Sequence, residues 1–358
     1  MRIVVDSHIP NIRGCIEPCA EVLYLDPGDI TREAVSNADA LIVRTRTRCD
    51  AALLDGSRVR FIGSATIGTD HIDLDYCSAH DITVRNAPGC NAPAVAQWVF
   101  CAIRAWMQAR DISTTEGLTL GIVGVGHIGS IVARWGRQLG FTVLLNDPPR
   151  ENAENMCMAE KTEKTENTEN TEKMERTGTA PDLAFLPLEE LQRRCDIITF
   201  HTPLTRDGQW PTWHLCDQAF LDGLERCRLL IDAARGPIAD NAALLGWHGD
   251  IALDCWENEP GISRELLEKA IVATPHIAGY SAEGKQRGTA MMLEALNEFC
   301  GWDIPVPEIV APATGAPDVT LDGIAASYDI LADSAALKAD ATAFESLRNT
   351  YHHRPEYQ

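Results

Sequence analysis

Three polar residues far apart in the sequence, Arg235, Glu259 and His276, are the strongest candidates for chemistry. Each follows an apolar run typical of a buried strand, and the carboxyl ends of parallel strands meet at one edge of a sheet. An imidazole titrates near neutral pH and can take a proton from a hydroxyl group. A carboxylate at its other ring nitrogen orients it, and a guanidinium can bind a substrate carboxylate through two hydrogen bonds. The set predicts oxidation of a 2-hydroxy acid by hydride transfer.

Each of these residues also has a plain structural explanation when it is taken alone. His276 could be a hydrogen-bonded core histidine, Arg235 a cap on a sheet edge, and Glu259 a carboxylate at a helix start beside Pro260. A cofactor site upstream in the same chain favours the catalytic interpretation of all three together.

A glycine-rich turn between two apolar runs predicts that cofactor site. The run 120–123 should be a buried strand, and Gly124, Gly126 and Gly129 follow it with G-x-G-x-x-G spacing at the start of a helix. The first glycine permits a tight turn, and the second lets backbone amides approach a pyrophosphate. The third allows the helix to pack closely on the strand. Such a unit that binds nothing remains the structural alternative.

Asp147 favours NAD over NADP as the cofactor. It follows a second apolar strand, 143–145, and its carboxylate can accept hydrogen bonds from both ribose hydroxyls. The same carboxylate would repel a phosphate group on the ribose. Arg150, three residues further on, keeps NADP open as the less favoured alternative.

Strand-like segments alternate with helical ones through most of the chain. We expect strands in a first lobe at 2–5, 22–25, 40–43, 61–65 and 83–85, and in a second at 120–123, 143–145, 196–200, 229–232, 251–253 and 271–273. This pattern predicts an α/β fold of two Rossmann-like or flavodoxin-like doubly wound lobes with a cleft between them. The expected domains are a substrate-binding lobe of residues 1–95 with about 275–300, and an NAD-binding Rossmann domain of residues 96–274.

The first lobe carries basic residues in an otherwise acidic chain. The formal charge is −21, from 31 basic and 52 acidic residues, which disfavours nucleic acid and anionic membranes as partners. Arg44, Arg46 and Arg48 follow the strand 40–43, and strand alternation would place their guanidinium groups on one side. They could hold an anionic substrate, or they could form an exposed strand end neutralised by nearby carboxylates.

Length and cysteine usage bound the class of protein. A chain of 358 residues with 45% hydrophobic residues can form sizeable cores. Its start lacks the pattern of a signal sequence and no apolar run is long enough to span a membrane, so we expect neither secretion nor membrane insertion. Its twelve cysteines are scattered, as expected of reduced thiols in the cytoplasm. Cys15 and Cys19 could hold zinc only with a second pair, which is not nearby, so we expect no metal.

Two segments differ from the rest. Residues 151–180 repeat Thr, Glu, Lys and Asn with almost no apolar residue, which predicts a solvated low-complexity insertion, although a role as an interaction segment stays open. From Gly301 the chain becomes proline-rich and then shows an amphipathic helical pattern over 335–351. Residues 301–358 therefore predict a linker and a small appendage.

The order of the motifs resembles the D-isomer-specific 2-hydroxyacid dehydrogenases. GVGHIG, HTPL, ARG, D-x-W-E-x-E-P and PHIAG occur in that order. NAPGCNAPAVAQWVF from Asn86 and TPHIAGYSAEGKQRGT from Thr274 resemble one branch of this family in particular, and the resemblance spans almost the whole chain. It implies an NAD-dependent enzyme for a small phosphorylated 2-hydroxy acid.

The resemblance also implies a role for individual residues. Arg235 and Glu259 would be catalytic, and His276 would handle the proton. Substrate would contact Thr45, Thr66 and Tyr280, with Arg44 available for a phosphate group. The cofactor contacts would be Gly124, Gly126, His127, Ile128, Gly129, Asp147, Thr202, Ala233, Ala234, Arg235, Asp254 and Gly279.

Some expectations remain open at this point. The family has a C-terminal dimerisation domain, and this chain matches only its earlier part, so a homodimer with a shortened domain is expected. Another 2-hydroxyacid dehydrogenase, of the phosphoglycerate or hydroxypyruvate type, would carry the same catalytic set. A binding protein that senses NAD(H) without catalysis would not need Arg235, Glu259 and His276 together.

Overall fold

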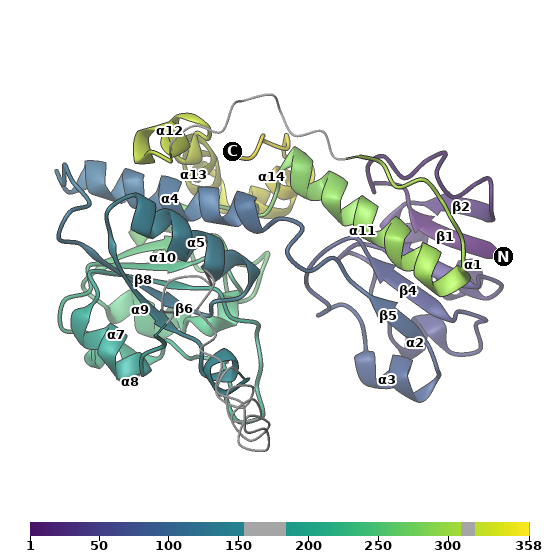
Figure 1. The fold of residues 1–358 in the computed structure, drawn as a ribbon, viewed down its shortest axis with the longest axis horizontal. Coiled ribbons are helices and arrows are strands. Elements are labelled where there is room, and N and C mark those ends of the chain that lie inside the picture. Colours follow the sequence, from purple (N-terminus) through teal and green to yellow (C-terminus); the bar gives the residue numbers. More distant parts are fainter. Residues whose placement is uncertain (154–183, 309–318, 358) are drawn as a thin grey trace, which may run out of the picture. The chain divides into compact units, whose positions relative to one another are not determined.

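Two compact units make up the structure, a computed structural model that describes residues 1–153, 184–308 and 319–357 (Figure 1). The first contains Met1–Ala94, Gly279–Ala316 and His353–Gln358, and the second contains Val95–Ala278 and Pro317–His352, as far as these ranges are described. The insertion expected at 151–180 lies outside the described residues apart from its first three positions. The roles expected for the two lobes stay predictions.

A five-stranded parallel sheet in the order β2-β1-β3-β4-β5 forms the centre of the first unit. Its strands are β1 (Arg2–Asp6), β2 (Glu21–Leu25), β3 (Ala40–Val43), β4 (Phe61–Ser64) and β5 (Thr83–Arg85). Successive residues of a strand point to opposite faces of a sheet. Ile3 accordingly packs in one buried cluster with Met292, and Val4 packs in another with Val35. Helices therefore cover both faces.

Helix α11 (Ala282–Cys300) covers one of these faces. It begins where the Ser281 hydroxyl accepts a hydrogen bond from the Gly284 amide at 3.0 Å, and it ends at Gly301, whose φ of 67° suits glycine. The opposite face of the sheet is covered by three short helices, α1 (Arg32–Val35), α2 (Ala51–Leu54) and α3 (Leu74–Ala79). The 3-10 turn η1 (Pro27–Asp29) precedes α1.

A six-stranded parallel sheet in the order β11-β10-β9-β8-β6-β7 forms the centre of the second unit. Its strands are β6 (Thr119–Val123), β7 (Thr142–Asn146), β8 (Ile197–Phe200), β9 (Leu229–Asp232), β10 (Asp250–Leu253) and β11 (Val272–Ala273). From β6 the chain first adds β7 on one side and then β8 on the other. The carboxyl ends of β6 and β8 thus form the switch point at which such sheets bind ligands.

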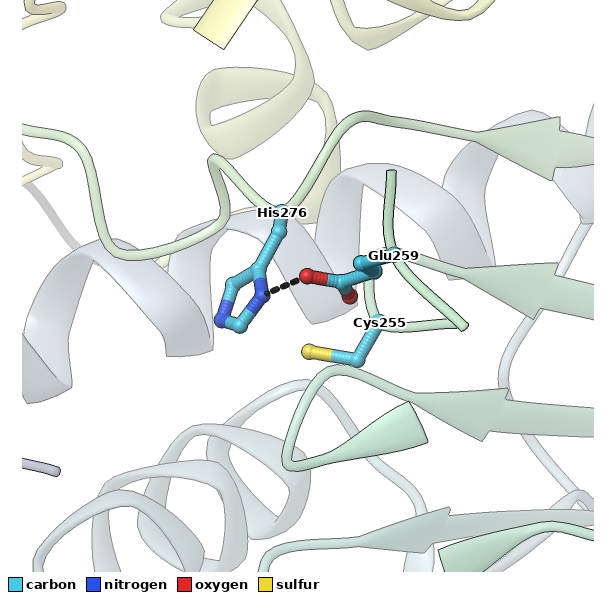
Figure 2. A group of neighbouring side chains, drawn as sticks. All are labelled: Cys255, Glu259 and His276. Carbon is cyan, nitrogen blue, oxygen red and sulfur yellow. Dashed lines mark hydrogen bonds and ion pairs between the residues drawn. The ribbon is translucent and has the colours of Figure 1, made fainter. Parts of the chain in front are cut away.

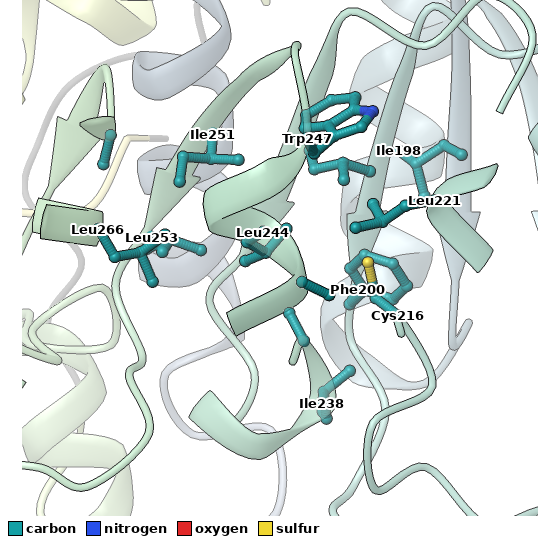
Figure 3. Close-up of a cluster of buried hydrophobic side chains, with 14 of the residues drawn as sticks. Ile198, Phe200, Cys216, Leu221, Ile238, Leu244, Trp247, Ile251, Leu253 and Leu266 are labelled. Carbon is teal, nitrogen blue, oxygen red and sulfur yellow. The ribbon is translucent and has the colours of Figure 1, made fainter. Parts of the chain in front are cut away.

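Helices cover both faces of this second sheet. Helices α4 (Ala92–Ala109) and α5 (His127–Gln138) share a face, where Gly136 of α5 lies close to Leu120 and Phe100. The other face bears α7 (Leu188–Arg194), α8 (Gln218–Asp222), η2 (Gly236–Ile238), α9 (Asn241–Gly246) and α10 (Arg264–Lys269). Their apolar residues pack on Phe200 and Leu253 of the strands (Figure 3).

The last described helices belong to the same unit. They are α12 (Leu321–Ala326), α13 (Ile330–Ala339), η3 (Ala341–Ala343) and α14 (Phe344–Asn349). Leu337 and Phe344 are fully buried in the cluster beside the six-stranded sheet. The single helix expected over 335–351 is wrong, because Asp340 is extended and its carboxylate instead caps a new turn at the Thr342 amide.

The two parallel sheets with their helices confirm the α/β fold class. All the expected strands are found, each to within one residue at either end. No helix in the described part of the chain combines the length and the apolar character needed to cross a membrane.

Phe344→Ala should lower the free energy of unfolding by about 3 kcal/mol or more, because it opens a cavity in the core of the second unit. Leu331→Ala, at a position that is 49% exposed on α13, should change it by less than about 0.5 kcal/mol. Urea denaturation of both variants checks this. Equal losses would show that α14 does not contribute to that core.

Candidate active site

The turn after β6 has the geometry that the glycine spacing predicts. Gly124 has a φ of 87°, and a Cβ atom there would lie 2.8 Å from the His201 backbone. A Cβ atom at Gly129 would lie 2.1 Å from the Gly124 carbonyl oxygen, so helix and turn touch at this point. A Cβ atom at Gly126, in contrast, would have no neighbouring atom within 4 Å. The backbone of this turn is therefore accessible at the one glycine where a pyrophosphate would approach.

Two further features fit a dinucleotide at this turn. Helix α5 begins at His127 without a side-chain cap, so its first amides and the positive end of its dipole are available to an anion. The hydroxyl oxygen of Thr202 is buried and has no hydrogen-bond partner among the described residues, and its methyl group lies beside Gly124. A buried hydroxyl group without a partner beside this turn fits a hydrogen bond to a bound dinucleotide.

Asp147 follows β7 and closes the other side of the turn. Its two carboxylate oxygens accept hydrogen bonds from the Val125 amide at 2.7 Å and the Arg150 amide at 3.1 Å. Each oxygen keeps a further lone pair for a ribose hydroxyl. The Arg150 guanidinium donates to the Val125 carbonyl at 2.6 Å, which commits part of it to the turn itself. This arrangement favours a dinucleotide without a ribose phosphate.

Glu259 and His276, predicted from sequence as partners, are hydrogen-bonded (Figure 2). The distance from His276 Nδ1 to Glu259 Oε2 is 2.8 Å. Burial alone would raise the pKa of Glu259, but the charge and hydrogen bond of His276 and the Trp256 amide outweigh it, so that pKa lies below its usual value. An ionised carboxylate only accepts, so Nδ1 carries a hydrogen, and in the neutral imidazole Nε2 is then the nitrogen with the lone pair.

The backbone around His276 is fixed by Asp254. His276 has a φ of 56°, a left-handed conformation that is uncommon for histidine, and its amide donates to the Asp254 carbonyl at 2.8 Å. The buried Asp254 carboxylate accepts from the amides of Ile277 at 2.8 Å and Ala278 at 2.9 Å. Burial raises the pKa of Asp254. Its observed contacts hold the turn, and the cofactor contact implied by the resemblance stays a prediction.

Arg235 stands at the carboxyl end of β9, half-buried, and donates to the Ala234 carbonyl at 2.7 Å. The next residue, Gly236, lies so close to the following loop that a Cβ atom there would be 2.0 Å from the Trp256 carbonyl oxygen. The Trp256 amide in turn donates to Glu259 Oε1 at 2.9 Å. The turn that carries Arg235 therefore abuts the loop that carries Glu259, as the strand-end argument predicted.

Cys255 joins this cluster, and the sequence analysis missed it (Figure 2). Its sulfur lies within 4.8 Å of ligand atoms of Glu259 and His276, which is the spacing of a metal site. Burial holds the pKa of the Cys255 thiol well above its usual value, so the thiol stays protonated. Metals bind the thiolate, and a neutral buried thiol disfavours such a site. Cys15 and Cys19 are free thiols.

The basic segment after β3 differs from the expectation. The chain turns directly after the strand, with the Thr47 amide donating to the Arg44 carbonyl at 3.3 Å, so the alternation that would align three guanidinium groups is wrong. The Arg44 guanidinium binds the buried Asp6 carboxylate through two hydrogen bonds of 2.9 and 3.3 Å. Arg48 pairs with Asp50 at 2.6 Å.

The remaining predicted substrate residues lie in the first unit. Thr45 is exposed in the turn after β3, and the Thr66 hydroxyl shares a 2.8 Å hydrogen bond with Ser64 at the end of β4. Gly279, which was predicted to contact the cofactor, also lies in this unit, where a Cβ atom would be 2.0 Å from the side-chain amide nitrogen of Asn91. Tyr280 follows it directly. Their contacts with ligands stay predictions.

Comparisons with known proteins agree with this geometry. The profile of the catalytic domain of D-isomer specific 2-hydroxyacid dehydrogenases matches residues 6–307. An erythronate-4-phosphate dehydrogenase of Bacteroides fragilis is 42% identical, with 99% of this chain and 97% of the relative covered. One of Cronobacter sakazakii is 38% identical, with 100% and 92% covered.

Solved structures share the fold. The TT0316 protein of Thermus thermophilus has a TM-score of 0.64 and 26% identity, over 86% of this chain and 99% of that chain. A D-lactate dehydrogenase of Aquifex aeolicus, in complex with NAD and lactic acid, has a TM-score of 0.64 and 22% identity, over 84% and 95%. The profile match over residues 6–307 and the 42% identity to a relative along nearly the whole chain show that the chain belongs to the D-isomer specific 2-hydroxyacid dehydrogenase family.

Proposed function

We propose that this chain oxidises 4-phospho-D-erythronate to (R)-3-hydroxy-2-oxo-4-phosphooxybutanoate with NAD, as a step in the synthesis of pyridoxal phosphate. The observation that carries the proposal is the 2.8 Å hydrogen bond between His276 and Glu259, in a chain 42% identical to an erythronate-4-phosphate dehydrogenase. The glycine turn, the Asp147 carboxylate and the buried Thr202 hydroxyl support NAD as the cofactor.

Proton removal falls to His276. With Nδ1–H held by Glu259, the Nε2 lone pair takes the proton of the substrate's 2-hydroxyl group. NAD, when bound, supplies the acceptor for the hydride that leaves carbon 2. The carbon–oxygen bond becomes a carbonyl, and the positive charge that develops on the imidazole is balanced by the ionised Glu259 carboxylate.

Arg235 binds the substrate carboxylate in this scheme. A guanidinium offers two parallel N–H donors that match a carboxylate, and its charge also polarises the adjacent oxygen at carbon 2. Its backbone position is fixed between the end of β9 and the Trp256 carbonyl. A carboxylate close to Arg235 would weaken this binding by neutralising the guanidinium.

Asp232 is such a neighbour, and its protonation state therefore matters. It is 2% exposed, one oxygen accepts from the Ala234 amide at 2.9 Å, and the other has no partner among the described residues. Burial, reinforced by Asp254 nearby, raises the pKa of Asp232 to about 8. At neutral pH this side chain is therefore protonated, and the charge of Arg235 stays available to the substrate.

Thr45, Thr66 and Tyr280 are the proposed substrate contacts in the first unit, and Arg44, which precedes Thr45 and pairs with Asp6, is the proposed cation for the phosphate group. The 4-phosphate distinguishes this substrate from lactate or glycerate, so hydroxyl and cationic groups are the chemistry required. We also propose a homodimer in the cytoplasm. The buried, free thiols among the described residues fit a reducing compartment.

His276→Ala should lower kcat by about 100- to 10,000-fold, because the general base is lost, while NAD binding stays within about twofold. His248→Ala, at an exposed histidine of the same unit, is the matched control and should keep parental turnover. Absorbance at 340 nm and a cofactor titration measure the two quantities. Equal turnover of both variants would show that His276 does not take part in the reaction.

Substrate choice separates the family members. The value of kcat/KM for 4-phospho-D-erythronate should exceed those for 3-phospho-D-glycerate and D-glycerate by roughly 100-fold or more. A preference for either competitor would contradict the proposed substrate. Absence of turnover with all three, together with NAD binding, would point to the sensing protein instead.

Asp232→Asn should stabilise the protein more at pH 8 than at pH 5. The pKa of Asp232 is about 8 in the folded protein against a usual value of 3.8, so between these pH values the folded protein keeps a proton that the unfolded chain has released. The free energy of unfolding of the parent therefore falls as the pH rises from about 4 to about 8. The variant lacks this loss and should gain roughly 2 kcal/mol or more at pH 8. Urea denaturation at both pH values measures the difference.

The matched control for that experiment is Asp207→Asn, at an exposed carboxylate in the same unit. It should show no pH-dependent gain. A gain for Asp232→Asn that is the same at pH 5 and pH 8 would mean that this carboxyl group does not hold its proton in the folded protein.

A further inference from the structure

Residues 353–357, termed the tail below, return to the first unit and pack on the segment that follows His276. Arg354, Glu356 and Tyr357 are buried, at 5%, 7% and 9% exposure. Ser281 pairs with Arg354 in a parallel bridge, and the Ala282 amide donates to the Arg354 carbonyl at 3.0 Å. The tail therefore lies beside the start of α11, where this isolated bridge pairs the two backbones.

The Arg354 side chain ties two separate stretches of backbone together. Its guanidinium donates to the Tyr280 carbonyl at 3.2 Å and to the Ala94 carbonyl at 3.1 Å. A buried guanidinium is stable only when its N–H groups have acceptors. Arg354 therefore stabilises the positions of the Tyr280 and Ala94 carbonyls. The backbone of Tyr280 is thereby fixed by a residue 74 positions away.

Glu356 fixes the start of α11 in the same way. Its carboxylate accepts from the Ser281 hydroxyl at 2.7 Å and forms an ion pair with Arg287. Its amide donates to the Glu283 carboxylate at 3.0 Å. Arg287 also donates to the Cys90 carbonyl at 2.7 Å, which extends the network to the chain before α4. Removing Arg287 would leave the buried Glu356 carboxylate without its cationic partner.

The ring of Tyr280 is held as well as its backbone. The His353 ring meets it edge to face, with centroids 6.0 Å apart, and the Lys285 ammonium lies 4.0 Å from its centroid. An edge-to-face contact and a cation over a ring both restrict the rotamers that a tyrosine can adopt. The tail thus contacts Tyr280 at its backbone, through Arg354, and at its ring, through His353.

We propose that the tail is a part of the substrate site, in which His353 and Arg354 are positioning residues that hold Tyr280 ready for the phosphorylated hydroxy acid. The proposal rests on the proposed function, since that assigns Tyr280 to the substrate. A tyrosine held in its binding position before the substrate arrives does not have to be ordered on binding, which strengthens affinity. Loss of the tail contacts should therefore raise KM for substrate and leave KM for NAD unchanged.

The test compares His353→Ala with His352→Ala, its exposed neighbour in sequence, which the structure assigns to the other unit. His353→Ala should raise KM for 4-phospho-D-erythronate roughly three- to tenfold, with KM for NAD and kcat within about twofold. His352→Ala should match the parent. Calorimetric titration of 4-phospho-D-erythronate into protein holding NADH, a pair that cannot react, measures the same affinity independently of turnover.

A double-mutant cycle shows whether the effect passes through Tyr280. In a Tyr280→Ala background, His353→Ala should cause no further loss, because its partner ring is already gone. Equal losses in both backgrounds would mean a general structural effect and would overturn the proposal. Arg354→Lys, which keeps the charge but cannot reach both carbonyls, should also raise KM for substrate if it folds; His353→Ala decides if it does not.

The outcomes separate this proposal from the proposed function. If the parent oxidises 4-phospho-D-erythronate and His353→Ala behaves like His352→Ala, the tail has no role in binding and the function stands. If the parent prefers another hydroxy acid, the proposed substrate is wrong, and the same cycle with that acid decides the role of the tail. A parent that binds and oxidises none of them overturns both.

Discussion

The hydrogen bond between Glu259 and His276 is the interaction on which the account depends. It requires a histidine in a left-handed conformation to stay opposite a carboxylate 17 positions earlier in the sequence. Asp254 makes this possible, because its backbone carbonyl and both carboxylate oxygens accept from residues 274–278 and hold the turn. The strain of that turn is thus balanced by buried hydrogen bonds at the strand end, where we propose that the substrate's hydroxyl group binds.

The sheets and the cofactor turn could be predicted from sequence because their causes are local. Buried parallel strands appear in the sequence as short apolar runs. In the cofactor turn, Gly124 and Gly129 lie so close to neighbouring backbone that a side chain would clash at either position. The meeting of Glu259 with His276 followed from one rule of topology, that parallel strands end at a common edge. Chemistry then restricted which residue types could act there.

Two kinds of feature could not be predicted in this way: contacts between distant residues, and local competition between a helix and a side-chain cap. Arg44 leaves the strand pattern because the buried Asp6 carboxylate, 38 positions earlier, binds its guanidinium, and sequence alternation cannot show that contact. The break at Asp340 is a local competition between a helix and a side-chain cap. From the sequence Cys255 is one scattered thiol among many, and only the fold shows it beside Glu259 and His276.

The pH dependence of kcat/KM in Glu259→Gln tests the pairing of Glu259 with His276, because this variant keeps the shape of the side chain and removes its charge. We expect a large loss of turnover and a shift of the acid-side midpoint to lower pH, because an uncharged partner no longer stabilises the imidazolium. An unchanged acid-side midpoint, with turnover close to that of the parent, would contradict the assignment of Glu259 and His276 as one proton-handling unit.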